Sequence, residues 1–147
     1  MITKPFVCVL LVLCAFEASA AAPACVKLEQ GWVRLTPGPM RMAAGYARIR
    51  NDCAGDVVVI GAGSKAFGEV SLHETTMVQG VSRMREIERL PIAAGTSVEL
   101  KPGGMHLMLM QPEVPLAEGA QLPLRLSLED GTRIDGLLQL RREAPAR

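Results

Sequence analysis

Hydrophobic and polar residues beyond position 25 alternate over short stretches, as expected for β-strands with one buried face. Such alternation, or a short apolar run, marks residues 45–50, 57–60, 70–77, 96–100, 122–128 and 132–140. Turn residues separate these stretches, including Pro37-Gly38-Pro39, Asn51-Asp52, Gln79-Gly80, Pro102-Gly103-Gly104, Glu118-Gly119 and Asp130-Gly131. The spacing predicts an all-β domain of about seven to nine strands, folded as a sandwich or Greek-key barrel.

The first residues of the chain have the organisation of a secretory signal peptide. Lys4 provides the positive start, residues 6–16 form an apolar run, and Ala18-Ser19-Ala20 provides small residues for cleavage. The apolar run has 11 residues, whereas a membrane-spanning helix needs about 20. We therefore expect the segment to be removed on export to the periplasm, with cleavage after Ala20 or Ala22.

This interpretation sets the boundaries of the mature protein. No later stretch is long and apolar enough to cross a bilayer, so we expect one soluble, monomeric domain. The predicted units are a signal peptide over residues 1–20, a β domain over residues 21–141 and a short flexible tail over residues 142–147.

Removal of the signal peptide leaves two cysteines, Cys25 and Cys53. In an oxidising compartment, an even pair of cysteines predicts a disulfide. Lipidation of Cys25, a redox dithiol and metal ligation are the alternatives. Ala22-Pro23-Ala24 is a poor lipidation context, and the pair lacks the C-x-x-C spacing of redox motifs. A structural disulfide is therefore favoured.

Composition excludes several classes of protein. A formal net charge of +1 gives no basic surface for nucleic acid, and 49% hydrophobic residues argue against disorder. The chain lacks the G-x-S-x-G motif of α/β-hydrolases, and no aspartate has an evident link to a histidine, so we expect a protein without enzymatic activity. What remains unusual is eight methionines beside only two histidines.

Both histidines have methionines on the same predicted strand face. His106, Met108 and Met110 alternate with apolar residues and therefore share one face. A two-residue turn at Gln79-Gly80 would pair Thr75 with Met84, which places Met84 diagonally from His73 on the same face. Diagonal neighbours lie about 7–8 Å apart at the backbone, within reach of long side chains. A three-residue turn would put Met84 on the opposite face.

Two imidazoles and two thioethers form a soft ligand set of the kind that selects Cu(I). Zinc usually takes thiolate or carboxylate ligands beside histidine, calcium takes oxygens, and a blue-copper centre needs a cysteine thiolate. We therefore interpret His73, Met84, His106 and Met108 as ligands of one Cu(I) ion. The outer-shell candidates, which share a face with the site or lie in a nearby loop, are Met40, Met42 and Met110.

The spacing H-x10-M-x21-H-x-M formed by these four residues resembles that of periplasmic CuA-type copper chaperones (PCuAC). Lys101-Pro102-Gly103-Gly104 before the second histidine also resembles that family, and the likeness extends over residues 30–140. The resemblance implies a cupredoxin-like β-barrel. It also implies delivery of Cu(I) to the CuA centre in cytochrome c oxidase subunit II, alone or with a Sco-type thiol protein.

Two departures from the family pattern limit what the resemblance implies. Glu74 stands where some members carry a methionine directly after the first histidine, and residues 141–147 contain no histidine or methionine. A second, Cu(II) site in the tail is therefore not expected. Two other functions remain open at this stage: copper sequestration or resistance, and a metal-free β-sandwich interaction module whose methionines only pack.

Overall fold

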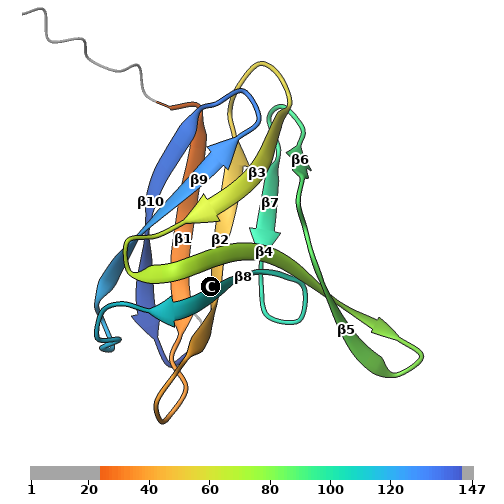
Figure 1. The fold of residues 1–147 in the computed structure, drawn as a ribbon. Coiled ribbons are helices and arrows are strands. Elements are labelled where there is room, and N and C mark those ends of the chain that lie inside the picture. Colours follow the sequence, from red (N-terminus) through yellow and green to blue (C-terminus); the bar gives the residue numbers. More distant parts are fainter. Residues whose placement is uncertain (1–23, 144–147) are drawn as a thin grey trace, which may run out of the picture.

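The computed structural model describes residues 24–143, and these residues form ten β-strands without an α-helix (Figure 1). The strands are β1 (Val26–Arg34), β2 (Met42–Asn51), β3 (Val57–Gly63), β4 (Phe67–Val78), β5 (Val81–Glu86), β6 (Leu90–Ile92), β7 (Ser97–Leu100), β8 (Met105–Pro112), β9 (Gln121–Leu128) and β10 (Arg133–Arg141). Within the described residues, therefore, no helix is available to span a membrane. The predicted signal peptide and residues 144–147 of the predicted tail lie outside the described residues.

The all-β prediction is confirmed, and the strand count exceeds the predicted range by one. β6 accounts for a strand that alternation cannot reveal, because it has only three residues and contains Pro91. It pairs with β3 alone, at the end of the sheet.

The strands form a continuous sheet in the order β5-β4-β8-β2-β1-β10-β9-β3-β6, with β7 pairing with β2 beside β8. All pairs are antiparallel except that between β1 and β10. The sheet curls over, so that β4 and β8 run across β1, β2 and β10 in Figure 1. This curvature gives the sheet an inner face that encloses the core and an outer face along β4, β8 and β2.

The core is built from aliphatic side chains of the inner face. Fully buried residues come from most of the long strands: Val33, Ile49, Val59, Leu107, Leu109, Leu124, Leu126, Leu138 and Leu140. Because side chains alternate along a strand, the residues between these core positions are directed to the outer face.

The hairpin of β4 and β5 projects from the body of the domain (Figure 1). Gln79 and Gly80 connect the strands with φ of 50° and 76°, the combination that a two-residue type I′ turn requires. Val78 therefore pairs with Val81 and Thr75 with Met84, which confirms the predicted register. β5 pairs only with β4, and its six residues are all exposed.

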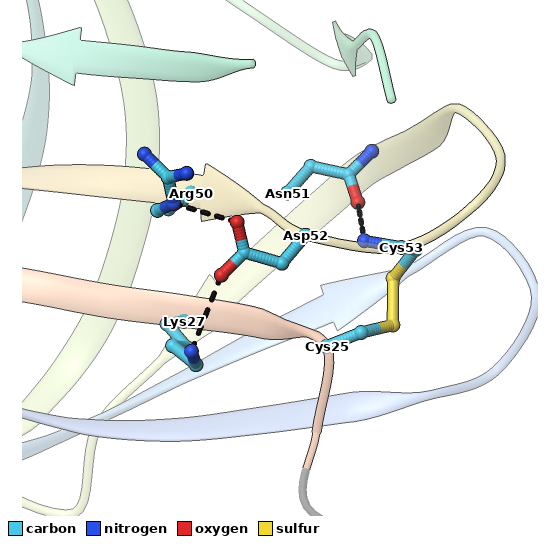
Figure 2. Close-up of polar contacts among 6 residues, drawn as sticks. All are labelled: Cys25, Lys27, Arg50, Asn51, Asp52 and Cys53. Atoms are coloured by element: carbon cyan, nitrogen blue, oxygen red, sulfur yellow. Dashed lines mark hydrogen bonds and ion pairs between the residues drawn. A yellow bond between two sulfur atoms is a disulfide. The ribbon is translucent and has the colours of Figure 1, made fainter. Parts of the chain in front are cut away.

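A disulfide joins Cys25, just before β1, to Cys53, just after β2 (Figure 2). Their Cα atoms lie 5.0 Å apart, and the backbone N–H of Asp52 donates to the carbonyl of Cys25 at 2.8 Å. The buried Asn51 completes this corner, because its Oδ1 accepts the N–H of Cys53 and its Nδ2 donates to the carbonyl of Ile92. The disulfide and these hydrogen bonds hold the ends of β1 and β2 together.

Charged side chains cover the same corner. The Asp52 carboxylate accepts hydrogen bonds from Arg50 Nε at 2.6 Å and Lys27 Nζ at 3.2 Å (Figure 2). These two cations, Arg50 first, hold the pKa of Asp52 below its ordinary value. These ion pairs lie at the surface, so the disulfide and the buried Asn51 are the main contributors to the stability of the corner.

The disulfide should make a measurable contribution to folding stability. It closes a loop with a sequence separation of 28, so the Cys25→Ala/Cys53→Ala variant should lose about 3–4 kcal/mol of unfolding free energy through the greater entropy of its unfolded chain. Urea unfolding of the oxidised protein with and without reductant measures this loss. The double variant is the control, since reductant should not change it. An unchanged wild-type midpoint under reductant would contradict the prediction.

Candidate metal centre

The pairing of β4 with β8 brings the two histidines together on the outer face. His73 is the direct partner of His106 in the register, and their ring centroids lie 6.0 Å apart with an interplanar angle of 28°. The adjacent pair, Leu72 and Leu107, is buried in the core. Because these leucines occupy the inner face, both imidazoles must take the outer one.

His106 is held in a defined orientation. It is only 9% exposed, and its Nδ1 lies 3.0 Å from the carbonyl oxygen of Gly104. Since a carbonyl can only accept, Nδ1 carries the proton and the lone pair of Nε2 remains available for a metal. The same carbonyl also accepts the N–H of Thr75 at 3.1 Å, which connects the loop before His106 to the part of β4 that pairs with Met84.

His73 has a different partner. Its Nε2 lies 2.9 Å from the hydroxyl of Ser71, two residues earlier on the same strand face. The hydroxyl can donate or accept, and either arrangement leaves Nδ1 of His73 free of this contact. Sequence reasoning missed Ser71 as an orienting residue, although the i, i+2 spacing on one strand is a signal that could have identified it.

The two predicted methionine ligands lie on the same face. Met108 is the direct partner of Ser71 across β4 and β8, and Met84 is the direct partner of Thr75 across β4 and β5. Met84, His106 and Met108 line a common cavity of about 320 Å³. His73 does not line this cavity but lies beside His106, so the structure brings the four predicted ligands into one region.

The three outer-shell candidates separate into two groups. Met40 and Met42 line the same cavity as the predicted ligands. Met110 does not line it, although it is the direct partner of Met42 in the register. Met77, which shares the strand face of His73 near the hairpin turn, is 67% exposed.

An aromatic and cationic group borders the cavity on the side of β1 and β2. Tyr46 and Arg34 line the cavity, the rings of Trp32 and Tyr46 have centroids 4.7 Å apart, and the Arg34 guanidinium lies 5.5 Å from the Tyr46 centroid. A β-bulge between Glu29 and Trp32 turns Trp32 toward Tyr46. Sequence reasoning did not identify this group, although Gly31 inside β1 is the kind of residue that signals a bulge.

The carboxylates near the histidines occupy different positions. Glu74, which follows His73, forms an ion pair with Arg85 at 2.6 Å on the opposite face of the hairpin. Glu86 is the direct partner of His73 on β5 and is exposed. Across residues 24–143, histidine, cysteine, aspartate and glutamate form no group of three or more that could hold a metal.

The donor set has a definite chemical character. Two imidazole nitrogens and two thioether sulfurs are uncharged, soft ligands, and such ligands favour Cu(I) over hard cations. A larger cavity of about 710 Å³ lies over β3, β9 and β10, lined by residues such as Lys65, Arg125 and Asp135 and without histidine or methionine. Three of the four predicted ligands, Met84, His106 and Met108, thus line the smaller cavity, and His73 lies beside His106.

Comparison with known proteins finds one matching family and two relatives. The family described as lipoprotein LpqE-like matches residues 26–137. A relative named as a lipoprotein, Lxx21020 of Leifsonia xyli subsp. xyli, is 33% identical over 108 residues, covering 73% of this chain and 64% of the relative. Protein RP573 of Rickettsia prowazekii is 28% identical over 116 residues, covering 76% of this chain and 64% of that protein. The chain thus spans about 64% of the length of each relative.

Solved structures share the fold. The solution structure of CuI-DR1885 from Deinococcus radiodurans is 27% identical, with a TM-score of 0.65 over 90% of this chain and 89% of that chain. The apo PCuAC domain from PmoF1 is 20% identical, with a TM-score of 0.66 over 83% of this chain and 96% of that chain. The copper-bound PCuAC domain from PmoF2 is 21% identical, with a TM-score of 0.65 over 84% of this chain and 97% of that chain. The predicted cupredoxin-like, all-β fold is therefore confirmed.

The structure places Cys25 in a disulfide. The family and one relative carry lipoprotein names, whereas the sulfur of Cys25 in this chain is bonded to Cys53. In this bonded form Cys25 has no thiol for a lipid, as the sequence context had indicated.

The hydrogen bond to Gly104 predicts the tautomer of His106. In the metal-free protein at alkaline pH, His106 should carry its proton on Nδ1, whereas His73 can adopt either tautomer beside Ser71. Long-range ¹H–¹⁵N NMR correlations of the imidazole rings distinguish the two forms. His73 is the internal comparison, and a His106 ring protonated on Nε2 would show that the Gly104 contact does not form in solution.

Proposed function

The chain belongs to the LpqE-like family, and we propose that it is an exported Cu(I) chaperone that binds one ion through His73, Met84, His106 and Met108. The observation that carries the proposal is the direct pairing of the two histidines across β4 and β8, with both methionines on the same face. Neutral, soft ligands suit Cu(I), because this monovalent d10 ion binds thioether and imidazole donors well and does not need an anionic ligand to balance its charge. The function is binding and transfer rather than catalysis.

The solved structures support copper as the cargo. CuI-DR1885 and the PmoF2 domain are named as copper-bound, and both have the fold of this chain. The H-x10-M-x21-H-x-M spacing occurs in this chain at the positions that the β4–β8 and β4–β5 registers bring together. The spacing and the fold therefore support the same assignment by independent routes.

The position of the site suits delivery by ligand exchange. Met84 is 52% exposed on the edge strand β5, whereas His106 is buried on the central strand β8. A partner can therefore replace the Met84 thioether first, while His106 and Met108 still hold the ion. We propose the CuA centre of cytochrome c oxidase subunit II as the acceptor, reached directly or through a Sco-type thiol protein.

We propose the periplasm as the compartment. The predicted signal peptide, the lipoprotein names of the family and of one relative, and the Cys25–Cys53 disulfide all support export to an oxidising environment. Copper(I) held by two thioethers needs no free thiol, so the site can operate where cysteines are oxidised.

Titration with a chromogenic Cu(I) chelator tests the site. The wild type should retain one tightly bound equivalent, and His73→Ala and His106→Ala should each lose it, because a single imidazole leaves the ion with too few nitrogen ligands. Met77→Leu, an exposed methionine near the turn, is the control and should bind as the wild type does. Failure of the wild type to compete with the chelator would leave a metal-free interaction module as the function.

Transfer is tested separately from binding. The copper-loaded protein is mixed with an apo CuA domain, and the copper content of each is measured after separation. Movement of copper to the CuA domain supports a chaperone, whereas copper that stays on this protein shows sequestration.

The position of Met84 on the face of the β4–β5 hairpin that carries His73 leads to a second prediction about the same site. Met84→Leu should weaken Cu(I) binding at least ~10-fold, since even residues that only orient a ligand cost 10–100-fold. Adding a thioether at the next position, in Met84→Leu/Arg85→Met, should not restore binding, because residue 85 faces away from His73. Chelator competition measures both variants. Recovery in the double variant would show that the strand face does not determine the ligand.

A further inference from the structure

The cavity beside the proposed Cu(I) site contains more thioethers than that site uses. Four of the eight methionines of the chain line it: Met40, Met42, Met84 and Met108. Met84 and Met108 belong to the proposed His/Met site, which leaves Met40 and Met42 without an assigned role. An aliphatic wall would serve packing equally well, so the concentration of sulfur at this cavity calls for a chemical explanation.

Met42 is directed toward the cavity by its place on β2. It is the first residue of that strand and is 52% exposed. Ala44, two residues further along β2, is the direct partner of Met108, so Met42 lies on the same outer face as Met108. Met42 and Met108 are therefore diagonal neighbours, about 7–8 Å apart at the backbone and within reach of two flexible side chains. Only the small side chain of Ala44 lies between them on β2.

Met40 approaches the cavity from the loop before β2. It is half-buried, and its sulfur accepts the backbone N–H of Thr36 at 3.3 Å. The end of the loop is attached to the sheet, since the carbonyl of Arg41 accepts the N–H of Gln111 at 3.0 Å. The thioether is thus held at the cavity wall, and its second lone pair remains available.

We propose that Met40, Met42 and Met108 form an outer position for a second soft monovalent ion, beside the His/Met site. This inference rests on the proposed function, because Met108 belongs to both positions. Thioethers alone select Cu(I) and Ag(I) and offer little to harder ions. An ion at the outer position can exchange Met40 and Met42 for the histidines while Met108 stays bound, with no change in charge or oxidation state.

Electrostatics makes the outer position the weaker of the two. Arg34 lines the same cavity, and the lining residues include no carboxylate. The Arg34 guanidinium lies 5.7 Å from the Trp32 centroid and 5.5 Å from the Tyr46 centroid. Both rings therefore stabilise this cation by cation–π interactions, and its positive charge remains beside the cavity. Two monovalent ions within one cavity still repel each other, and the second equivalent should bind at least ~10-fold more weakly than the first. The outer position therefore serves passage of the ion rather than storage.

Ag(I) titration followed by native mass spectrometry and by NMR of the methionine methyl groups tests the proposal. The wild type should take up a first equivalent and then a weaker second one, which shifts the methyl signals of Met40 and Met42. Met40→Leu and Met42→Leu should each lose the second equivalent and keep the first, and Met42→Leu, at an exposed side chain, should also keep the thermal stability of the wild type. Met110→Leu is the matched control, because Met110 pairs with Met42 but does not line the cavity.

The outcomes separate this inference from the proposed function. A wild type that binds a single equivalent, or a Met110→Leu variant that loses the second equivalent as completely as Met42→Leu, overturns the outer position. His106→Ala should lose the tight equivalent and retain a weak one that still shifts the methyl signals of Met40 and Met42. A wild type that binds no Ag(I) and no Cu(I) overturns the proposed function itself.

Discussion

The burial of Leu72 and Leu107 as direct partners across β4 and β8 is the constraint on which the rest of the site depends. A strand that slips by one residue exchanges its two faces, so a slip here would move leucines into solvent and His73 into the core. The cost of that exchange fixes the register. The same register places Met108 opposite Ser71 and allows the Gly104 carbonyl to reach both β4 and His106. Hydrophobic packing on one face thus determines the polar geometry of the other.

The local features of the fold could be predicted from the sequence because their causes are local. Alternation identified most strands, and Gln79-Gly80 identified the two-residue turn that sets the position of Met84. The grouping of His106 with Met108 followed from their spacing on one strand. β6 escaped detection because three residues cannot establish a period, and the bulge that turns Trp32 to the outer face depends on contacts with β2.

The surroundings of the predicted ligands could not be derived in the same way, because they come from segments that are distant in the sequence. Met40 was a candidate from its loop position, but the attachment that holds it at the cavity, from Arg41 to Gln111 on β8, is a contact between distant segments. Arg34 enters from β1, on the far side of β2. Sequence patterns describe which face a residue takes on its own strand, whereas the shape of a cavity depends on which strands become neighbours.

The edge position of β5 has a consequence for the thermodynamics of the site. Two of the proposed ligands lie on β8, in the interior of the sheet, whereas Met84 lies on a strand that has one neighbour and no buried residue. Any ion that uses Met84 must restrict the conformational freedom of the hairpin, and this loss of entropy opposes binding. The affinity is therefore set partly by the stiffness of the Gln79-Gly80 turn and not by the donor atoms alone. Substitutions in a turn that never touches the ion can tune how tightly it is held.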